Sequence, residues 1–104
     1  MVKATKKQTK PKKTEKRLEK VPAEYVFWSR DGRIFSDLFD LAEGLAAMTD
    51  ETYIYHSNAE KHDFANWVRD VIGDIELADS LACTMDRLEA ANCVTGRILI
   101  LTGK

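Results

Sequence analysis

The sequence predicts a small, mainly α-helical domain of about four helices with a short N-terminal β-hairpin, preceded by a disordered basic tail. Apolar residues recur at helical spacing from residue 38 to about residue 85. Ahead of them, an Asp-Gly pair separates two short β-favouring runs. Residues 1–20 contain nine basic and two acidic side chains and no aromatic residue. The alternative class is α+β, which would follow if residues 97–102 formed a strand.

Charge divides the chain into a tail over residues 1–21 and a single domain over residues 22–104. Nine basic minus two acidic side chains give residues 1–20 a net charge of +7, whereas seven basic and fifteen acidic ones give residues 21–104 a net charge of −8. The tail has too little apolar surface to offset its ordering entropy, which predicts disorder. About 80 residues remain after Pro22, enough for one small core but not for a cofactor fold plus a substrate domain.

The hairpin is predicted from two short β-favouring runs, 25–28 and 33–35, on either side of Arg30-Asp31-Gly32. An Asp-Gly pair between such runs favours a tight turn. A two-stranded hairpin is marginal in water on its own, so we expect helices to pack beneath it. All nine aromatic residues lie within residues 25–67. The second half of the domain must therefore contribute Leu, Ile, Val and Ala to the core.

Two helices are predicted next. Ser36 is the expected N-cap of the first, with Asp37 in its first turn, where a carboxylate favours the helix dipole. This helix ends near Met48, and its buried stripe consists of Leu38, Leu41, Ala42, Leu45 and Met48. Thr49 or Asp50 can cap a short second helix, which carries Tyr53, Ile54 and His56 and ends at Ser57-Asn58.

The remaining helices follow the same spacing. A third begins at Asp63, as N-cap or first-turn residue, and ends before Gly73, because glycine suits a left-handed C-cap. Its apolar stripe consists of Phe64, Trp67, Val68, Val71 and Ile72. Asp74 can start a fourth helix that reaches Met85 and can continue through Ala91. Residues 97–101 fit either a strand or the last helical turns, since Thr95 and Gly96 weaken a helix.

The order of motifs between residues 22 and 82 is distinctive. Gly32 follows an aromatic run, and the motifs after it are Leu38, Leu41, Leu45 and Met48, then Tyr53, Tyr55-His56, Asp63-Phe64-Ala65-Asn66-Trp67-Val68 and Asp74 with Leu77-Ala78. This order resembles a family of small uncharacterised domains, mostly archaeal and some bacterial, whose pattern includes His, then Asn-Asp-Phe-x-x-Trp-Val, then Asp-x-x-Leu-Ala. Here His62 stands where that family has Asn. The resemblance implies a mainly helical fold and no activity, and some relatives carry a Lys-rich N-terminal extension.

Histidine and carboxylate side chains could in principle build a metal site. His56, His62 and Asp63 are suitable ligand types, but their spacing is not diagnostic and neither cysteine is near them in the sequence. We therefore expect His56 to hydrogen-bond a helix end under the aromatic cluster and His62 to precede a cap. Four carboxylates could form an acid/base or magnesium site, but helical spacing puts them mostly on solvated faces. They are Asp70, Asp74, Asp79 and Asp86.

Nucleophilic catalysis and base stacking are weighed in the same way. Cys83 falls on an apolar helix face, where a thiol would be buried and inert. Phe64 and Trp67, like Phe27 and Trp28, could stack on unpaired bases, but the acidic domain favours a core role, with Trp28 as the one that could be exposed. No Walker, Cys-x-x-Cys or His-Glu-x-x-His spacing occurs. We predict no enzyme, no catalytic residue, no metal site and no cofactor.

The favoured function is a non-enzymatic adaptor that binds DNA, RNA or the ribosome through the tail, by salt-dependent and weakly sequence-specific contacts. The predicted nucleic-acid-binding residues are Lys3, Lys6, Lys7, Lys10, Lys12, Lys13, Lys16, Arg17 and Lys20. The acidic domain would contact a protein partner or a second copy.

Three alternatives stay open. In the first, the protein is an interaction module whose tail folds back on the domain until an acidic partner or an anionic membrane surface displaces it. In the second, the tail serves solubility only. A small metal-dependent hydrolase is the third, and it would need metal in the purified protein. No signal-peptide pattern occurs, and the longest apolar run, Ile98–Leu101, is far short of the roughly 20 residues of a membrane span. We expect a cytoplasmic protein in which Cys83 and Cys93 are reduced.

Overall fold

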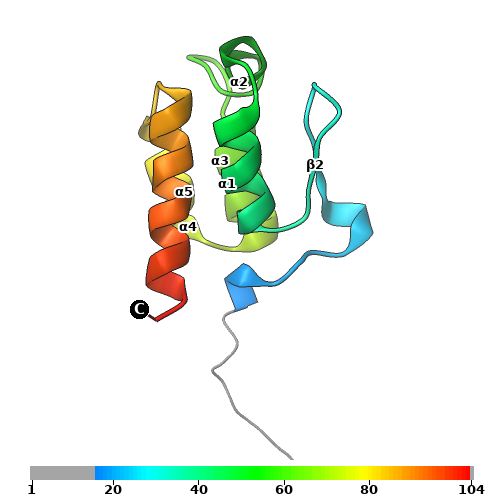
Figure 1. Cartoon of the computed structure of the whole chain (residues 1–104), viewed down its shortest axis with the longest axis vertical. Helices are drawn as coiled ribbons and strands as arrows, with labels where there is room; N and C mark the ends of the chain where they lie inside the picture. The colour runs from blue at the N-terminus through cyan, green and yellow to red at the C-terminus, as the bar shows by residue number, and fades with distance from the viewer. Residues whose placement is uncertain (1–15, 104) are drawn as a thin grey trace, which may run out of the picture.

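A computed structural model describes residues 16–103 and confirms the predicted mainly helical fold with a hairpin ahead of the helices (Figure 1). Two short 3-10 helices, η1 (Lys16–Leu18) and η2 (Ala23–Tyr25), precede the strands β1 (Phe27–Trp28) and β2 (Ile34–Phe35). The helices are α1 (Leu38–Ala47), α2 (Asp50–His56), α3 (Asp63–Trp67) with its π-helical continuation η3 (Val68–Ile72), α4 (Ile75–Cys83) and α5 (Arg87–Leu101).

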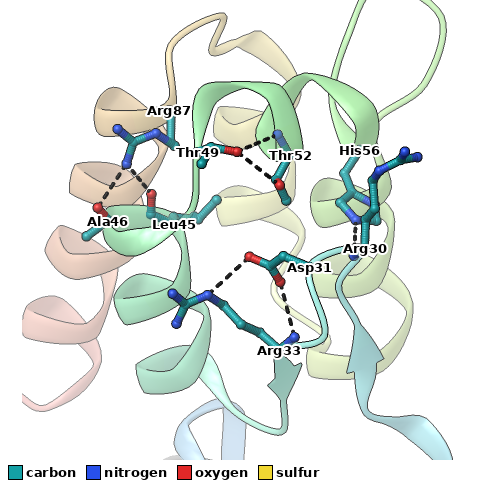
Figure 2. Close-up of polar contacts among 9 residues, drawn as sticks. All are labelled: Arg30, Asp31, Arg33, Leu45, Ala46, Thr49, Thr52, His56 and Arg87. Atoms are coloured by element: carbon teal, nitrogen blue, oxygen red, sulfur yellow. Dashed lines mark hydrogen bonds and ion pairs between the residues drawn. The ribbon is translucent and has the colours of Figure 1, made fainter.

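The hairpin is antiparallel and forms around the predicted Asp-Gly turn. Phe27 pairs with Phe35, and Trp28 pairs with Ile34. Gly32 takes a φ of 94°, a left-handed conformation that few other residues adopt without strain. The carboxylate of Asp31 accepts the backbone N–H of Arg33 at 3.1 Å and pairs with its Nε at 3.2 Å (Figure 2). The turn is therefore held by its own side chains.

The helix caps differ from the prediction at one position. The N-cap of α1 is Asp37, whose side chain accepts the N–H of Asp40 at 2.8 Å. Ser36 lies one residue earlier and instead donates its N–H and its hydroxyl to the carboxylate of Asp40. Both residues are good caps, and the longer Asp side chain takes the position next to the helix. Thr49 caps α2, as predicted (Figure 2).

The predicted fourth helix is two helices, because the chain breaks at residues 84–86. Thr84 ends α4, and its hydroxyl bonds the Leu81 carbonyl at 2.9 Å and the Tyr53 hydroxyl at 3.1 Å. Asp86 then caps α5 by accepting the N–H of Glu89. The expected continuation through Ala91 was therefore wrong. Residues 97–101 are helical, so the α+β alternative was wrong as well.

The core lies between two pairs of helices. Figure 1 shows α1 and α5 side by side, with α3 and α4 behind them and the hairpin on the other side of α1. Fully buried side chains of α1, α3, α5 and their neighbours meet there, namely Leu38, Leu41, Leu45, Phe64, Val68 and Val94. Phe35 of β2 packs directly on Gly44, where a Cβ atom would overlap its ring. This glycine therefore lets the hairpin approach α1.

Candidate nucleic-acid interface

Three of the nine predicted tail cations, Lys16, Arg17 and Lys20, lie in the described part of the chain. Residues 16–21, here called the strap, run past the end of the α1–α5 pair that lies opposite α2 (Figure 1). The other six cations lie outside the described residues: Lys3, Lys6, Lys7, Lys10, Lys12 and Lys13. Within the described residues, the last part of the predicted tail, residues 16–21, contacts the helical domain.

Two cations of the strap are paired with helix caps. Lys20 Nζ lies 3.1 Å from Asp37 Oδ2 and 3.9 Å from Asp40 Oδ2. The hydrogen bond and charge of Asp37 raise the pKa of Lys20. Arg17 Nη1 lies 3.9 Å from Oδ2 of Asp74, the N-cap of α4. The strap is thus held at the N-terminal ends of two helices, where the helix dipole also favours the carboxylates that hold it.

Apolar packing and one backbone hydrogen bond complete the attachment of the strap. The N–H of Val21 donates to the Ser36 carbonyl at 2.8 Å. Leu18 and Val21 are partly buried against the core. Disorder was expected over residues 16–21 because the tail has little apolar surface, but these contacts offset the entropy lost when the segment is ordered. The sequence did not indicate them because the hydrogen-bond and ion-pair partners in the domain lie at least 15 positions away.

Asp74 is the residue whose environment differs most from the prediction. It was expected on a solvated face, yet its side chain is 1% exposed. Its Oδ1 accepts the N–H of Leu77 at 3.1 Å, and its Oδ2 accepts Nε–H of Arg97 at 2.7 Å. The hydrogen bond from Arg97 to Asp74 raises the pKa of this arginine. Asp70, Asp79 and Asp86 are exposed, as predicted.

His56 lies beneath the aromatic cluster, as predicted, in contact with Phe27 and Phe64. Its Nε2 accepts the backbone N–H of Arg30 at 2.9 Å (Figure 2), so the ring is neutral in this arrangement and carries its proton on Nδ1. Nδ1 then donates to Asp63 Oδ2 at 3.0 Å. The pair ties the hairpin turn to the start of α3. His62 occupies the N-cap position of α3 without a side-chain cap bond.

Metal ligands do not gather in this region. Within residues 16–103, no three His, Cys, Asp or Glu side chains are close enough together to hold a metal ion. The suggested set of His56, His62 and Asp63 is therefore not brought together. His56 and Asp63 are instead joined by a direct hydrogen bond.

Two cations flank the exposed side chain of Tyr55, which is not one of the predicted binding residues. Arg30 Cζ lies 4.3 Å from the centre of the Tyr55 ring, and Lys61 Nζ lies 4.4 Å from it. Cations over an aromatic face are attracted by its quadrupole. Lys61 also pairs with Asp63 at 3.3 Å, so this Tyr55 patch (Arg30, Tyr55 and Lys61) is partly neutralised. The three residues come from a turn, a helix and a loop, so only the fold brings them together.

The aromatic residues considered for base stacking are mostly core residues. Phe64 and Trp67 are buried, and Trp67 Nε1 donates to the Tyr25 carbonyl at 2.8 Å. Phe27 packs against the rings of Phe35 and Phe64. Trp28 is 68% exposed on the outer face of the hairpin. The predicted core role is confirmed for the first three residues, and Trp28 is the exposed one.

The cysteines are free thiols in different environments. Cys83 is exposed at the end of α4, so the prediction that it is buried was wrong. The chain leaves the helix directly after Cys83, and the core-facing positions of α4 are Leu77, Ala78 and Leu81. Cys93 is partly buried, and this burial, helped by the negative charge of Glu89, raises the pKa of its thiol.

No helix within residues 16–103 is long and apolar enough to cross a membrane. No family model matches the chain, and searches of curated proteins and of solved structures found no match either. The resemblance to the small uncharacterised family stays a prediction based on the motifs quoted above.

Proposed function

We propose that the protein is a non-enzymatic adaptor that binds nucleic acid through the lysines ahead of the strap, while its helical domain contacts a protein. The observation that carries the proposal is the separation of charge. Residues 1–15 contain six lysines and one acidic residue, Glu15, whereas residues 16–103 contain nine basic and sixteen acidic side chains, a difference of −7. A phosphate polymer is attracted by the first part and repelled by the second.

The attachment of the strap supports this arrangement. Because residues 16–21 are packed on the domain, the lysines of residues 3–13 are joined to the domain at one end of the α1–α5 pair. The surface near the hairpin and α2 lies at the opposite end (Figure 1). A nucleic acid bound through the basic segment would therefore leave that surface open to a partner.

A second surface for a partner lies on α4, α5 and the link between them. Five large apolar side chains on α4, α5 and the link between them are more than half exposed: Ile75, Met85, Leu88, Leu99 and Ile100. Large apolar side chains exposed on these two helices are available for contact with a protein. This supports a protein partner or self-association as the second half of the adaptor role.

A salt titration tests the nucleic-acid half. If about five lysines contact phosphates of duplex DNA, log K should fall with log[salt] with a slope of about −4.5. Replacing the six lysines of residues 1–15 by glutamine in the full chain should abolish binding at physiological salt. Equal binding by both proteins, or binding by neither, would contradict the proposal. Parallel titrations with duplex DNA and single-stranded RNA show which polymer is preferred.

A second candidate function is favoured by the ion pairs of the strap. The pairs of Arg17 with Asp74 and of Lys20 with Asp37 show cations of the basic segment bound to carboxylates of the domain. An interaction module whose basic segment is displaced by an acidic protein partner would use the same chemistry. Absence of nucleic-acid binding at physiological salt, together with binding of poly-glutamate, would favour this module over the adaptor.

A further inference from the structure

Eight of the nine cations of residues 3–20 fall into two groups with different surroundings, and the ninth, Lys16, is exposed at the start of the strap. Six lysines lie at residues 3–13, and the nearest acidic residue after them in the sequence is Glu15. Arg17 and Lys20 lie in the strap, within 4 Å of carboxylates of the domain. The sequence presents all nine as one run, and only the fold separates them.

We infer that Arg17 and Lys20 anchor the strap and take no part in binding nucleic acid, which is left to the six lysines ahead of the strap and to Lys16. This inference rests on the proposed function for its binding half. Its anchoring half rests on the strap contacts alone and can be tested without nucleic acid.

Electrostatics around Lys20 argue against a phosphate contact there. Two carboxylates, Asp37 and Asp40, lie 3.1 and 3.9 Å from its Nζ, and Ser36 Oγ lies at 3.3 Å. A phosphate that approached Nζ would meet both negative charges at close range. The Lys20 side chain is 68% exposed, but its charge is already paired with Asp37, so a phosphate there would compete with that carboxylate and gain little from counterion release.

Arg17 is held in a different way. Its partner Asp74 is almost fully buried, and Arg97 binds the same carboxylate oxygen. Turning Arg17 outward towards a phosphate would remove one of the two cations that compensate a buried charge, which is unfavourable. Leu18 and the Val21 N–H would be pulled in the same direction, away from the core and from the Ser36 carbonyl.

The predicted number of phosphate contacts follows from this division. With the six upstream lysines and Lys16 available, the magnitude of the slope of log K against log[salt] on duplex DNA cannot exceed about 6. All nine cations together would allow a slope of about −8. The slope therefore reports how many cations bind.

Two double variants of the full chain separate anchors from binding residues. Arg17→Gln with Lys20→Gln removes two cations from the strap, and Lys12→Gln with Lys13→Gln removes two upstream, so both change the net charge equally. Binding of fluorescein-labelled duplex DNA is followed by anisotropy between about 50 and 200 mM salt. Thermal unfolding and hydrogen exchange of the Val21 amide are measured on the same proteins without DNA.

The strap variant should keep the wild-type slope, lower the unfolding midpoint by a few degrees and speed exchange at Val21. The upstream variant should lose about 1.8 from the slope magnitude, at about 0.9 per contact, and keep the midpoint and the exchange rate. Equal loss of slope in both variants would overturn the inference. If even the wild type fails to bind DNA, the proposed function fails, and unchanged Val21 exchange in the strap variant would still overturn the anchoring half.

Discussion

Replacing Asp74 by asparagine should destabilise the domain more than any other single change of one carboxylate to an amide within residues 16–103. The substitution keeps an oxygen that can accept the Leu77 N–H, so the cap of α4 is retained. It removes the negative charge that Arg97 Nε approaches to 2.7 Å, in a site where Asp74 is 1% exposed. The substitution therefore measures the contribution of the negative charge alone, without loss of the helix cap.

The magnitude follows from the burial of the pair. Breaking a buried ion pair by removing one partner costs about 3 to 5 kcal/mol. Glu76, which is exposed and lies 3.0 Å from Arg97 Nη1, still pairs with the arginine and compensates part of its charge. We therefore expect Asp74→Asn to lower the free energy of unfolding by about 2 to 3 kcal/mol. Asp74→Ala should cost about 1 kcal/mol more, because the cap is lost as well.

Urea unfolding followed by circular dichroism measures these differences. Glu76→Gln is the matched control, since it removes a carboxylate from the same arginine at an exposed position, and it should change the free energy by less than about 0.5 kcal/mol. By heat, Asp74→Asn should lower the midpoint by about 10 to 20 °C. If Asp74→Asn costs no more than Glu76→Gln, the reasoning about the buried pair is refuted.

Three further predictions test the packing and the caps. Gly44→Ala should cost about 1 to 3 kcal/mol, because the new methyl group overlaps the Phe35 ring, whereas Gly96→Ala, with open space around it in α5, should stabilise by about 0.5 to 1 kcal/mol; equal effects in urea unfolding would contradict this. Arg87→Met should lower the free energy of unfolding by about 1 to 2 kcal/mol, because two carbonyls at the end of α1 lose their hydrogen-bond donor (Figure 2). If calorimetry finds the unfolding midpoint of this variant unchanged, water has replaced the guanidinium as the donor and the prediction is wrong. Although burial opposes it, hydrogen bonds from Ser36 lower the pKa of Asp40. Because the pKa of Asp40 is lower in the folded than in the unfolded state, its ionised form stabilises the fold above the unfolded pKa of about 3.9, and this stability is lost as the pH falls through the folded pKa. Asp40→Asn should therefore make the free energy of unfolding less dependent on pH below about pH 4, and the same pH dependence in both proteins would contradict the assignment.

Much of the fold follows from local patterns. The stripes of α1 and α3 could be predicted because each consists of apolar residues three and four positions apart. The hairpin could be predicted from its Asp-Gly turn. The break between α4 and α5 was missed because the Thr84 hydroxyl bonds Tyr53, 31 positions earlier. A contact between residues so far apart cannot be predicted from the spacing of neighbouring residues.

The candidate interface depended more on distant contacts. Arg17 and Lys20 belong to a Lys-rich run, and composition alone groups them with the residues before them. Their partners Asp74 and Asp37 cap helices far along the chain. An aspartate at a predicted helix start is recognisable as a cap, but its second role as the partner of a distant cation depends on how the helices pack. The Tyr55 patch could not be predicted for the same reason, because its three residues come together only in the folded domain.

The most direct test of the account is an NMR titration of the isotopically labelled full chain with duplex DNA. Amide signals of residues 1–15 should shift in proportion to the DNA added, and those of the strap and of the Tyr55 patch should stay in place. Shifts of this kind that disappear at high salt would support an arm that binds apart from its domain. The largest shifts at Arg17, Lys20 or the Tyr55 patch, with residues 1–15 unaffected, would contradict it.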